Sequence, residues 1–318
     1  MELLRLVCMF MVMVCHANGY INEGDLFGVN GVIRLIINQF CLICVNCFVM
    51  LSGWFGIRAS WKGAAKLLFQ VVFVAVLCFA VFAALGQPVS FKNDLFPYLA
   101  FGYGYWFVIS YLVLYALSPV LEAFIRDVSE SNFRKALYFI FAAEMVYGYI
   151  LGEGSYGFGF SPIAFISIYL LARYTRMYPG KLFALNKTYD LLVYVLATVL
   201  SIIGLWFGYK LFGMGFHLNH YDSPLAIIAS LYFLLFFSKL KIDSQTINWL
   251  AASAFAIYLF HENSLVSPYY HQLFSWLEDT LPISAFYPLM FILLFFIGLI
   301  ILFVDKLRLF LWKRISHS

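Results

Sequence analysis

The chain has 318 residues, of which 64% are hydrophobic, 20% aromatic and only 11% charged, and its net charge is +4. A water-soluble domain carries about 25% charged residues and about half apolar ones, so this composition cannot cover a soluble surface and indicates a polytopic membrane protein. The basic residues are dispersed between hydrophobic runs, which argues against a nucleic-acid partner and makes membrane lipids the expected surroundings.

The first hydrophobic segment, 3–20, is expected to be a transmembrane helix rather than a cleaved signal peptide. Glu2 precedes a single Arg5, with no basic region ahead of the apolar run and no small-x-small cleavage site. His16 follows Arg5 by eleven positions. In a helix, eleven residues turn through about 1100° and rise about 16 Å, which returns to within ~20° of the starting direction. Arg5 and His16 therefore share one helical face, and ionisable residues inside membrane helices are by default functional candidates.

Further apolar runs follow along the chain, each near the ~20 residues that cross a hydrocarbon core. The connecting segments are short, and neither a soluble domain nor a clear repeat lies between them. We therefore expect one integral-membrane domain over 1–318, an all-α bundle of about ten transmembrane helices. The predicted spans are 3–20, 33–56, 66–86, 99–121, 135–151, 158–173, 189–212, 223–239, 248–267 and 283–304.

The distribution of lysine and arginine predicts the orientation of this bundle. With ten spans and a cytoplasmic N-terminus, seventeen basic residues fall on inner segments and three, Arg34, Lys92 and Lys210, on outer ones. Both termini are therefore predicted to be cytoplasmic. Arg5 then lies at the inner face, and His16 lies in the outer half of the first helix.

Two patterns are similar to metal sites, and we predict a metal from neither. Cys41, Cys44 and Cys47 are spaced like part of an iron–sulfur run, but no fourth cysteine or proline follows, so small packing residues are favoured. His217 and His220 lie three positions apart, without a third ligand at a suitable spacing. Polar and aromatic residues in that outer segment are better suited to a sugar.

Four stretches, in this order, resemble the integral-membrane acyltransferase 3 family, which includes sugar and polysaccharide O-acetyltransferases. Arg5 through His16 matches its basic-x10-histidine signature. Residues 46–55 (Asn-Cys-Phe-Val-Met-Leu-Ser-Gly-Trp-Phe) resemble its aromatic-rich end of helix 2, residues 106–119 its Trp-Phe…Leu-Tyr…Pro helix, and residues 256–261 (Ala-Ile-Tyr-Leu-Phe-His) its Ile-Tyr-Leu-x-His motif. The resemblance runs from residue 2 to about residue 310.

The chain departs from the family pattern in three respects. Arg58, Lys62 and Lys66 are spread over the turn where many members carry a tight arginine cluster, and the Trp-Phe helix has no acidic residue. No esterase-like domain is appended. The resemblance therefore implies a short, stand-alone member in a bacterial cytoplasmic membrane, and it leaves the acceptor open.

The resemblance implies transfer of an acyl group, with acetyl expected, from cytoplasmic acyl-coenzyme A to a hydroxyl of a cell-envelope saccharide or glycolipid. Acyl-coenzyme A is a donor substrate here, and no permanently bound cofactor is predicted. Because coenzyme A is polyanionic, the inner mouth should be cationic. Arg5, Arg58, Lys62 and Lys66 are predicted to bind the donor there, since short loops bring the first three helices together.

His16 is predicted to be the general base, because histidine can take up a hydroxyl proton and return it near neutral pH. A transient acyl-histidine is the alternative, and the residues alone do not separate the two. His16 should have an orienting partner. The antiparallel second helix puts Asn46 at a similar depth, and Glu144 is the acidic residue in the middle of a span. We assign His16, Asn46 and Glu144 to the catalytic group.

The acceptor is expected to bind at His261, Trp106, Tyr111 and His220. The main competing interpretation is a transporter or flippase for a lipid-linked saccharide, which also requires many spans and a polar path. The ordered motifs argue against it, as does the absence of broken helices in matched halves, which inverted repeats would show. A polysaccharide polymerase is disfavoured by the short outer loops, and a non-enzymatic scaffold leaves the Arg5–His16 face unexplained. The oligomeric state is not predicted.

Overall fold

The computed structural model describes residues 1–318 except 20–26, 100–103, 152–156 and 317–318. Within the described residues the chain is all-helical and has no β-strand, which confirms the predicted class. The helices are α1 (Glu2–Asn18), α2 (Val29–Cys41), α3 (Cys44–Phe55), α4 (Trp61–Ala84), α5 (Trp106–Asp127), α6 (Glu130–Ala143), α7 (Pro162–Met177), α8 (Lys187–Phe212), α9 (Pro224–Ser238), α10 (Gln245–Ala251), α11 (Ala254–His261), α12 (Ser267–Thr280) and α13 (Ile283–Ile315). Shorter helical turns are η2 (Phe91–Leu95), η3 (Phe96–Tyr98), η4 (Glu144–Ile150) and η5 (Gly157–Gly159).

Five helical stretches in the described part of the chain are long and apolar enough to cross a membrane. They are Val29–Phe55, Trp61–Ala84, Trp106–Asp127, Lys187–Phe212 and Ile283–Ile315. Other predicted spans appear as shorter helices, such as α1 with 17 residues and α9 with 15. The chain is thus built of membrane helices, while ten spans and the sidedness of the termini stay predictions.

Two of the predicted spans are interrupted helices. Span 33–56 consists of α2 and α3, which meet at Leu42 and Ile43. Span 248–267 is divided between α10, α11 and the first residue of α12. Hydropathy sums apolar side chains over a window, so a turn inside an apolar run leaves no mark in the pattern.

Polar side chains determine where several helices begin. The side chain of each capping residue accepts a hydrogen bond from a backbone N–H in the first turn, which has no partner inside the helix. The capping residues are Ser60 of α4, Ser129 of α6, Ser161 of α7, Asn186 of α8 and Ser244 of α10. The polar segments between the apolar runs therefore carry the start signals of the helices that follow them.

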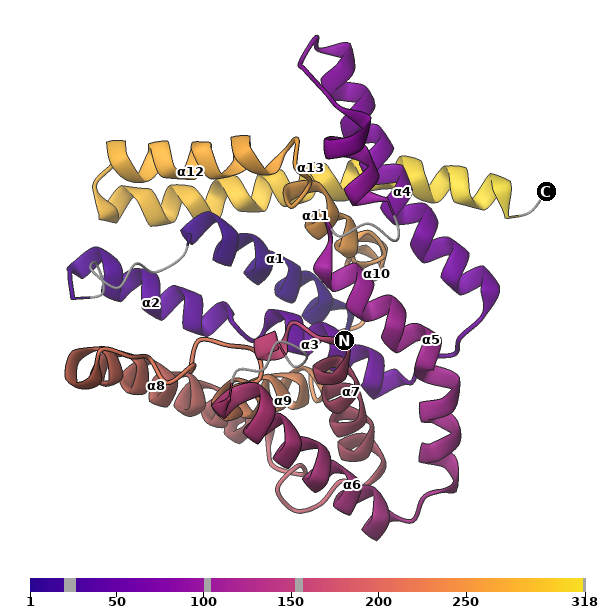
Figure 1. The fold of residues 1–318 in the computed structure, drawn as a ribbon, viewed down its shortest axis with the longest axis vertical. Coiled ribbons are helices and arrows are strands. Elements are labelled where there is room, and N and C mark those ends of the chain that lie inside the picture. Colours follow the sequence, from indigo (N-terminus) through magenta and orange to yellow (C-terminus); the bar gives the residue numbers. More distant parts are fainter. Residues whose placement is uncertain (20–26, 100–103, 152–156, 317–318) are drawn as a thin grey trace.

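Helix α1 lies at the centre of the bundle. Leu4, Cys8 and Met13 are fully buried, and α1 packs against α2, α3, α9, α10, α11, α12 and α13. Figure 1 shows α1 between the antiparallel α12–α13 pair and the α8–α9 pair. A helix in this position holds Arg5 and His16 inside the bundle, where each lines a cavity.

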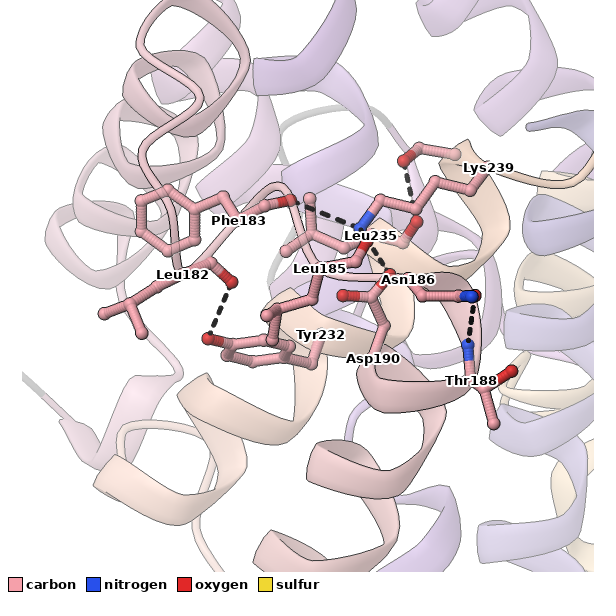
Figure 2. Close-up of polar contacts among 10 residues, drawn as sticks. Leu182, Phe183, Leu185, Asn186, Thr188, Asp190, Tyr232, Leu235 and Lys239 are labelled. Atoms are coloured by element: carbon pink, nitrogen blue, oxygen red, sulfur yellow. Dashed lines mark hydrogen bonds and ion pairs between the residues drawn. The ribbon is translucent and has the colours of Figure 1, made fainter.

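An ion pair fastens the segment between α7 and α8 to the end of α9 (Figure 2). The Lys239 ammonium donates to the carbonyl oxygens of Phe183 and Leu185, at 3.2 and 2.8 Å, and to Asp190 Oδ2 at 2.5 Å. The Asp190 side chain is completely buried, whereas that of Lys239 is 27% exposed. Lys239 therefore neutralises a buried carboxylate and satisfies two backbone carbonyls of the connecting segment.

We expect Lys239→Met to destabilise the protein by about 3–5 kcal/mol, because it leaves the Asp190 carboxylate buried without its counter-charge. Thermal unfolding of the purified protein in detergent measures the effect. Lys241→Met is the matched control, since Lys241 is an exposed lysine two residues on, and it should unfold like the parent. Asp190→Asn combined with Lys239→Met should recover part of the loss; equal stability of parent and Lys239→Met would contradict this role.

Candidate active site

The candidate site is formed by two cavities whose linings share Phe48 and Phe107, named outer and inner here after the predicted orientation of the bundle. The outer cavity has a volume of about 510 Å³ and is lined by His16, Glu262, Trp106, His220, Tyr221 and Tyr258, among others. The inner cavity has a volume of about 520 Å³ and is lined by Arg5, Lys66, Gln70, Tyr111 and Arg308, among others. Helix α1 contributes Arg5 to the inner cavity and His16 to the outer one, so the two residues of the shared helical face serve different chambers.

His16 is held by the end of α11. Its Nδ1 lies 2.8 Å from His261 Nε2 and 3.0 Å from Glu262 Oε1. His261 Nδ1 lies 2.6 Å from the carbonyl oxygen of Ile257, which can only accept. His261 therefore carries its proton on Nδ1 when neutral, and its Nε2 is an acceptor.

These contacts define the tautomer of His16. Both partners of its Nδ1, the His261 nitrogen and the Glu262 carboxylate, are acceptors, so Nδ1 carries the hydrogen. The neutral ring then has its lone pair on Nε2. His16 and Glu262 both line the outer cavity, and the contacts described above engage Nδ1, so the arrangement suits a base that accepts a proton on Nε2 while a carboxylate fixes its other nitrogen.

Tyrosine hydroxyls fix the backbone on both sides of this contact. Tyr270 of α12 donates to the carbonyl oxygen of Met13, at 2.6 Å, one turn before His16. Tyr105 donates to the carbonyl oxygen of Leu259 at 2.5 Å, and the Asn263 side chain donates to the Tyr105 hydroxyl at 3.3 Å. The chain on either side of Glu262 is thereby anchored to the start of α5, which reduces the freedom of the carboxylate relative to His16.

The same three side chains have the spacing of a possible metal site. One donor atom from each of His16, His261 and Glu262 lies within 4.8 Å of the other two. Two histidines and a carboxylate are a common ligand set for zinc. The Nδ1 proton of His16, placed between two acceptors, is by itself sufficient to account for the close approach of all three groups, and the expectation of no metal stays a prediction.

The inner cavity is lined by basic side chains. Arg5 and Lys66 line it together with Glu2, which forms an ion pair with Arg5 at 2.5 Å. Tyr111 and Ser52 line its wall and their hydroxyls are hydrogen-bonded at 2.9 Å. Basic side chains at a cavity wall are the expected complement of an anionic ligand.

Two phenylalanines separate the cavities. Phe48 of α3 and Phe107 of α5 line both of them. Their ring centroids are 6.4 Å apart and the ring planes are nearly perpendicular, at 89°. An extended ligand that reaches from Arg5 to His16 would therefore pass this aromatic pair.

The structure brings together some of the residues predicted for the catalytic and donor sites. Glu262, rather than Asn46 or Glu144, occupies the Nδ1 side of the His16 ring. Asn46 donates to the carbonyl oxygen of Tyr221 at 2.8 Å. Glu144 is buried in η4, and neither cavity includes it in its described lining.

Arg58 and Lys62 are exposed and lie outside the described lining of the inner cavity, whereas Arg5 and Lys66 belong to it. The lining residues of α4 begin at Gly63, whereas Arg58 precedes this helix and Lys62 stands in its first turn. A donor role for Arg58 and Lys62 stays a prediction.

The residues predicted for the acceptor fall into three groups. Trp106 and His220 line the outer cavity with His16, and Tyr111 lines the inner one. His261 is 1% exposed and contacts His16 directly, so the structure places it behind the His16 ring. Burial and the neighbouring His217 lower the pKa of His220 to about 4, which leaves a neutral ring that can exchange hydrogen bonds with a hydroxyl.

Membrane helices surround a partly exposed histidine–carboxylate contact that lines a cavity, which defines a helical membrane protein with a candidate base in its interior. Residues 1–304 match the family model of acyltransferase 3, which is described as an acyltransferase domain. The chain belongs to this family and is an acyltransferase of the membrane-helix type, which confirms the resemblance of its four motifs. No curated protein and no solved structure matches the chain.

Proposed function

We propose that this protein is a membrane O-acyltransferase, which moves an acyl group, expected to be acetyl, from cytoplasmic acyl-coenzyme A to a hydroxyl of a cell-envelope saccharide. The observation that carries the proposal is the pair of cavities that meet at Phe48 and Phe107. One offers Arg5 and Lys66 to an anion and the other offers His16 to a hydroxyl. The polyanionic end of acyl-coenzyme A suits the cavity with Arg5 and Lys66. Its thioester end and a neutral acceptor suit the cavity with His16.

In the proposed reaction the acceptor binds in the outer cavity beside Trp106 and His220. Aromatic faces suit the apolar surface of a sugar ring, and a neutral histidine suits its hydroxyls. The acceptor hydroxyl gives its proton to His16 Nε2 while its oxygen attacks the thioester carbonyl carbon. The carbon–sulfur bond then breaks, and the leaving thiolate takes the proton from His16.

Glu262 is the positioning residue in this scheme. Its carboxylate accepts from His16 Nδ1, so it fixes the ring and compensates the positive charge that forms when Nε2 takes the proton. His261 also accepts from that N–H but carries no charge in its Nδ1-protonated form. The carboxylate therefore stabilises the imidazolium, and His261 limits the direction in which the ring can turn.

The overall activity is tested in membrane vesicles of known orientation with labelled acetyl-coenzyme A. We expect label to enter endogenous glycan when the donor is supplied to the cytoplasmic face, and to be absent in vesicles without the protein. Excess chelator should leave transfer unchanged. If glycolipid crosses the membrane only when the chain is present and no glycan is labelled, the protein is a transporter and the proposal is wrong.

Arg5→Gln should raise KM for acetyl-coenzyme A about tenfold and change kcat little, because a hydrogen bond to a charged group contributes roughly 1.5–3 kcal/mol and 1.4 kcal/mol is a factor of ten. Initial rates in the same vesicles provide both constants. Lys181→Gln is the matched control: Lys181 is exposed between α7 and α8, and the variant should keep the parent KM. A fall in kcat alone would place Arg5 outside the donor site.

A further inference from the structure

The final membrane helix contains a buried ion pair that the transfer chemistry does not use. In α13, Arg308 Nε donates to Asp305 Oδ1 at 2.7 Å and Arg308 Nη2 donates to Asp305 Oδ2 at 2.6 Å. The side chains of Arg308 and Asp305 are 1% and 0% exposed. Burying a charged pair carries a large desolvation penalty, so such a pair is poor evidence for stability and a reason to look for a function.

One nitrogen of this guanidinium remains unused. Arg308 Nη1 is buried and has no hydrogen-bond partner among the described residues. Arg308 is also a lining residue of the inner cavity, together with Arg5, Lys66 and Gln70. Because Asp305 takes the Nε and Nη2 edge in a two-point contact, the plane of the guanidinium is fixed and Nη1 is left as the donor without a partner.

The charge of the cavity points to the class of ligand. Its described lining contains three cationic side chains, Arg5, Lys66 and Arg308, against one acidic side chain, Glu2. Phosphate oxygens accept several hydrogen bonds at once, and a guanidinium with a fixed plane loses little freedom on binding them. Gln70, whose amide lies 3.5 Å from Asp305 Oδ1, joins α4 to the same pair and lines the same wall.

We propose that Arg308, held by Asp305, forms with Arg5 and Lys66 a phosphate-binding site in the inner cavity, and that this site binds a phosphate of the acyl-coenzyme A donor. The second part rests on the proposed function. Arg308 contacts the ligand, and Asp305 is a positioning residue that sets the plane of the guanidinium. The alternative is a purely structural brace between α4 and α13, in which Nη1 never meets a ligand.

Direct binding to the purified protein in detergent separates these possibilities. The probes are coenzyme A, inorganic pyrophosphate and pantetheine, which lacks phosphate. We expect Arg308→Gln to weaken binding of coenzyme A and pyrophosphate tenfold or more and to leave pantetheine unaffected. Lys313→Gln is the matched control, because Lys313 is an exposed lysine on the same helix, and it should bind all probes as the parent does.

Arg308→Gln leaves Asp305 buried without its partner, so Asp305→Asn/Arg308→Gln is measured beside it. The double variant has no unpaired charge and should fold like the parent while showing the same loss of coenzyme A binding. Parent-like binding of coenzyme A by the double variant overturns the proposed site and leaves a brace. If the parent binds pyrophosphate through Arg308 but does not bind coenzyme A, the phosphate site stands and the donor assignment falls. If the parent binds neither, both are overturned.

Discussion

His16→Ala is expected to lower kcat for acetyl transfer by about 10²–10⁴-fold, the range typical for removal of a general base. KM for acetyl-coenzyme A should stay close to that of the parent, because the proposed site for the polyanionic end of the donor is near Arg5, about 16 Å away and three helical turns down α1. Steady-state rates with purified protein and a saccharide acceptor measure both constants. Parent-like kcat in His16→Ala would remove His16 from the mechanism.

His220→Ala serves as the comparison for His16→Ala, since both histidines line the outer cavity and only His16 contacts Glu262. Its effect should fall on KM for the acceptor rather than on kcat. A separate incubation with labelled acetyl-coenzyme A and no acceptor tests the acyl-histidine alternative. We expect no label on the protein. Label that is present in the parent and absent in His16→Ala would establish a covalent intermediate in place of direct transfer.

Glu262→Gln is expected to lower kcat about 10–100-fold, since it replaces a charged hydrogen-bond acceptor, which contributes roughly 1.5–3 kcal/mol, with a neutral one of the same shape. KM for donor and acceptor should change little. In the His16→Ala background the substitution should have no further effect, because residues that act as a unit are non-additive. This double-variant result distinguishes positioning of His16 from a general structural role.

The comparison for Glu262→Gln is Asp279→Asn, which removes an exposed carboxylate near the end of α12. It should leave kcat unchanged. Equal losses from Glu262→Gln in the parent and in the His16→Ala background would mean that the carboxylate acts independently of the histidine. In that case Asn46 and Glu144 would need to be tested as partners of His16.

The sequence predicted the position of His16 in the fold better than its surroundings. Spacing alone placed Arg5 and His16 on one face of one helix, and the structure puts that helix at the centre of the bundle. The partner Glu262 lies 246 positions away from His16, so no local pattern connects them. The signal that did exist was the resemblance of residues 256–261 to a family motif, which ends one residue before Glu262.

Other differences arise because sequence patterns record polarity and not direction. Depth matching made Asn46 reachable from His16, but the Asn46 amide bonds to the Tyr221 carbonyl. In the prediction of membrane orientation, Arg308 was simply one of the seventeen basic residues assigned to the inner side. In the structure α13 continues to Ile315, eleven residues beyond the predicted span that ends at residue 304, and Arg308 is buried in this extension.

The Phe48–Phe107 pair has a consequence for the energy supply of the cell. In the predicted orientation one cavity faces each side of the membrane, so an open path between them would let ions leak, and each elementary charge that crosses 100 mV dissipates about 2.3 kcal/mol. Two apolar rings with centroids 6.4 Å apart occupy the position where the cavities meet. An uncharged thioester arm can displace aromatic side chains, whereas a hydrated ion must first shed water. The aromatic pair would thus be a barrier to ions between the two cavities. An acyl group could pass between the two compartments while the ion gradient across the membrane is kept.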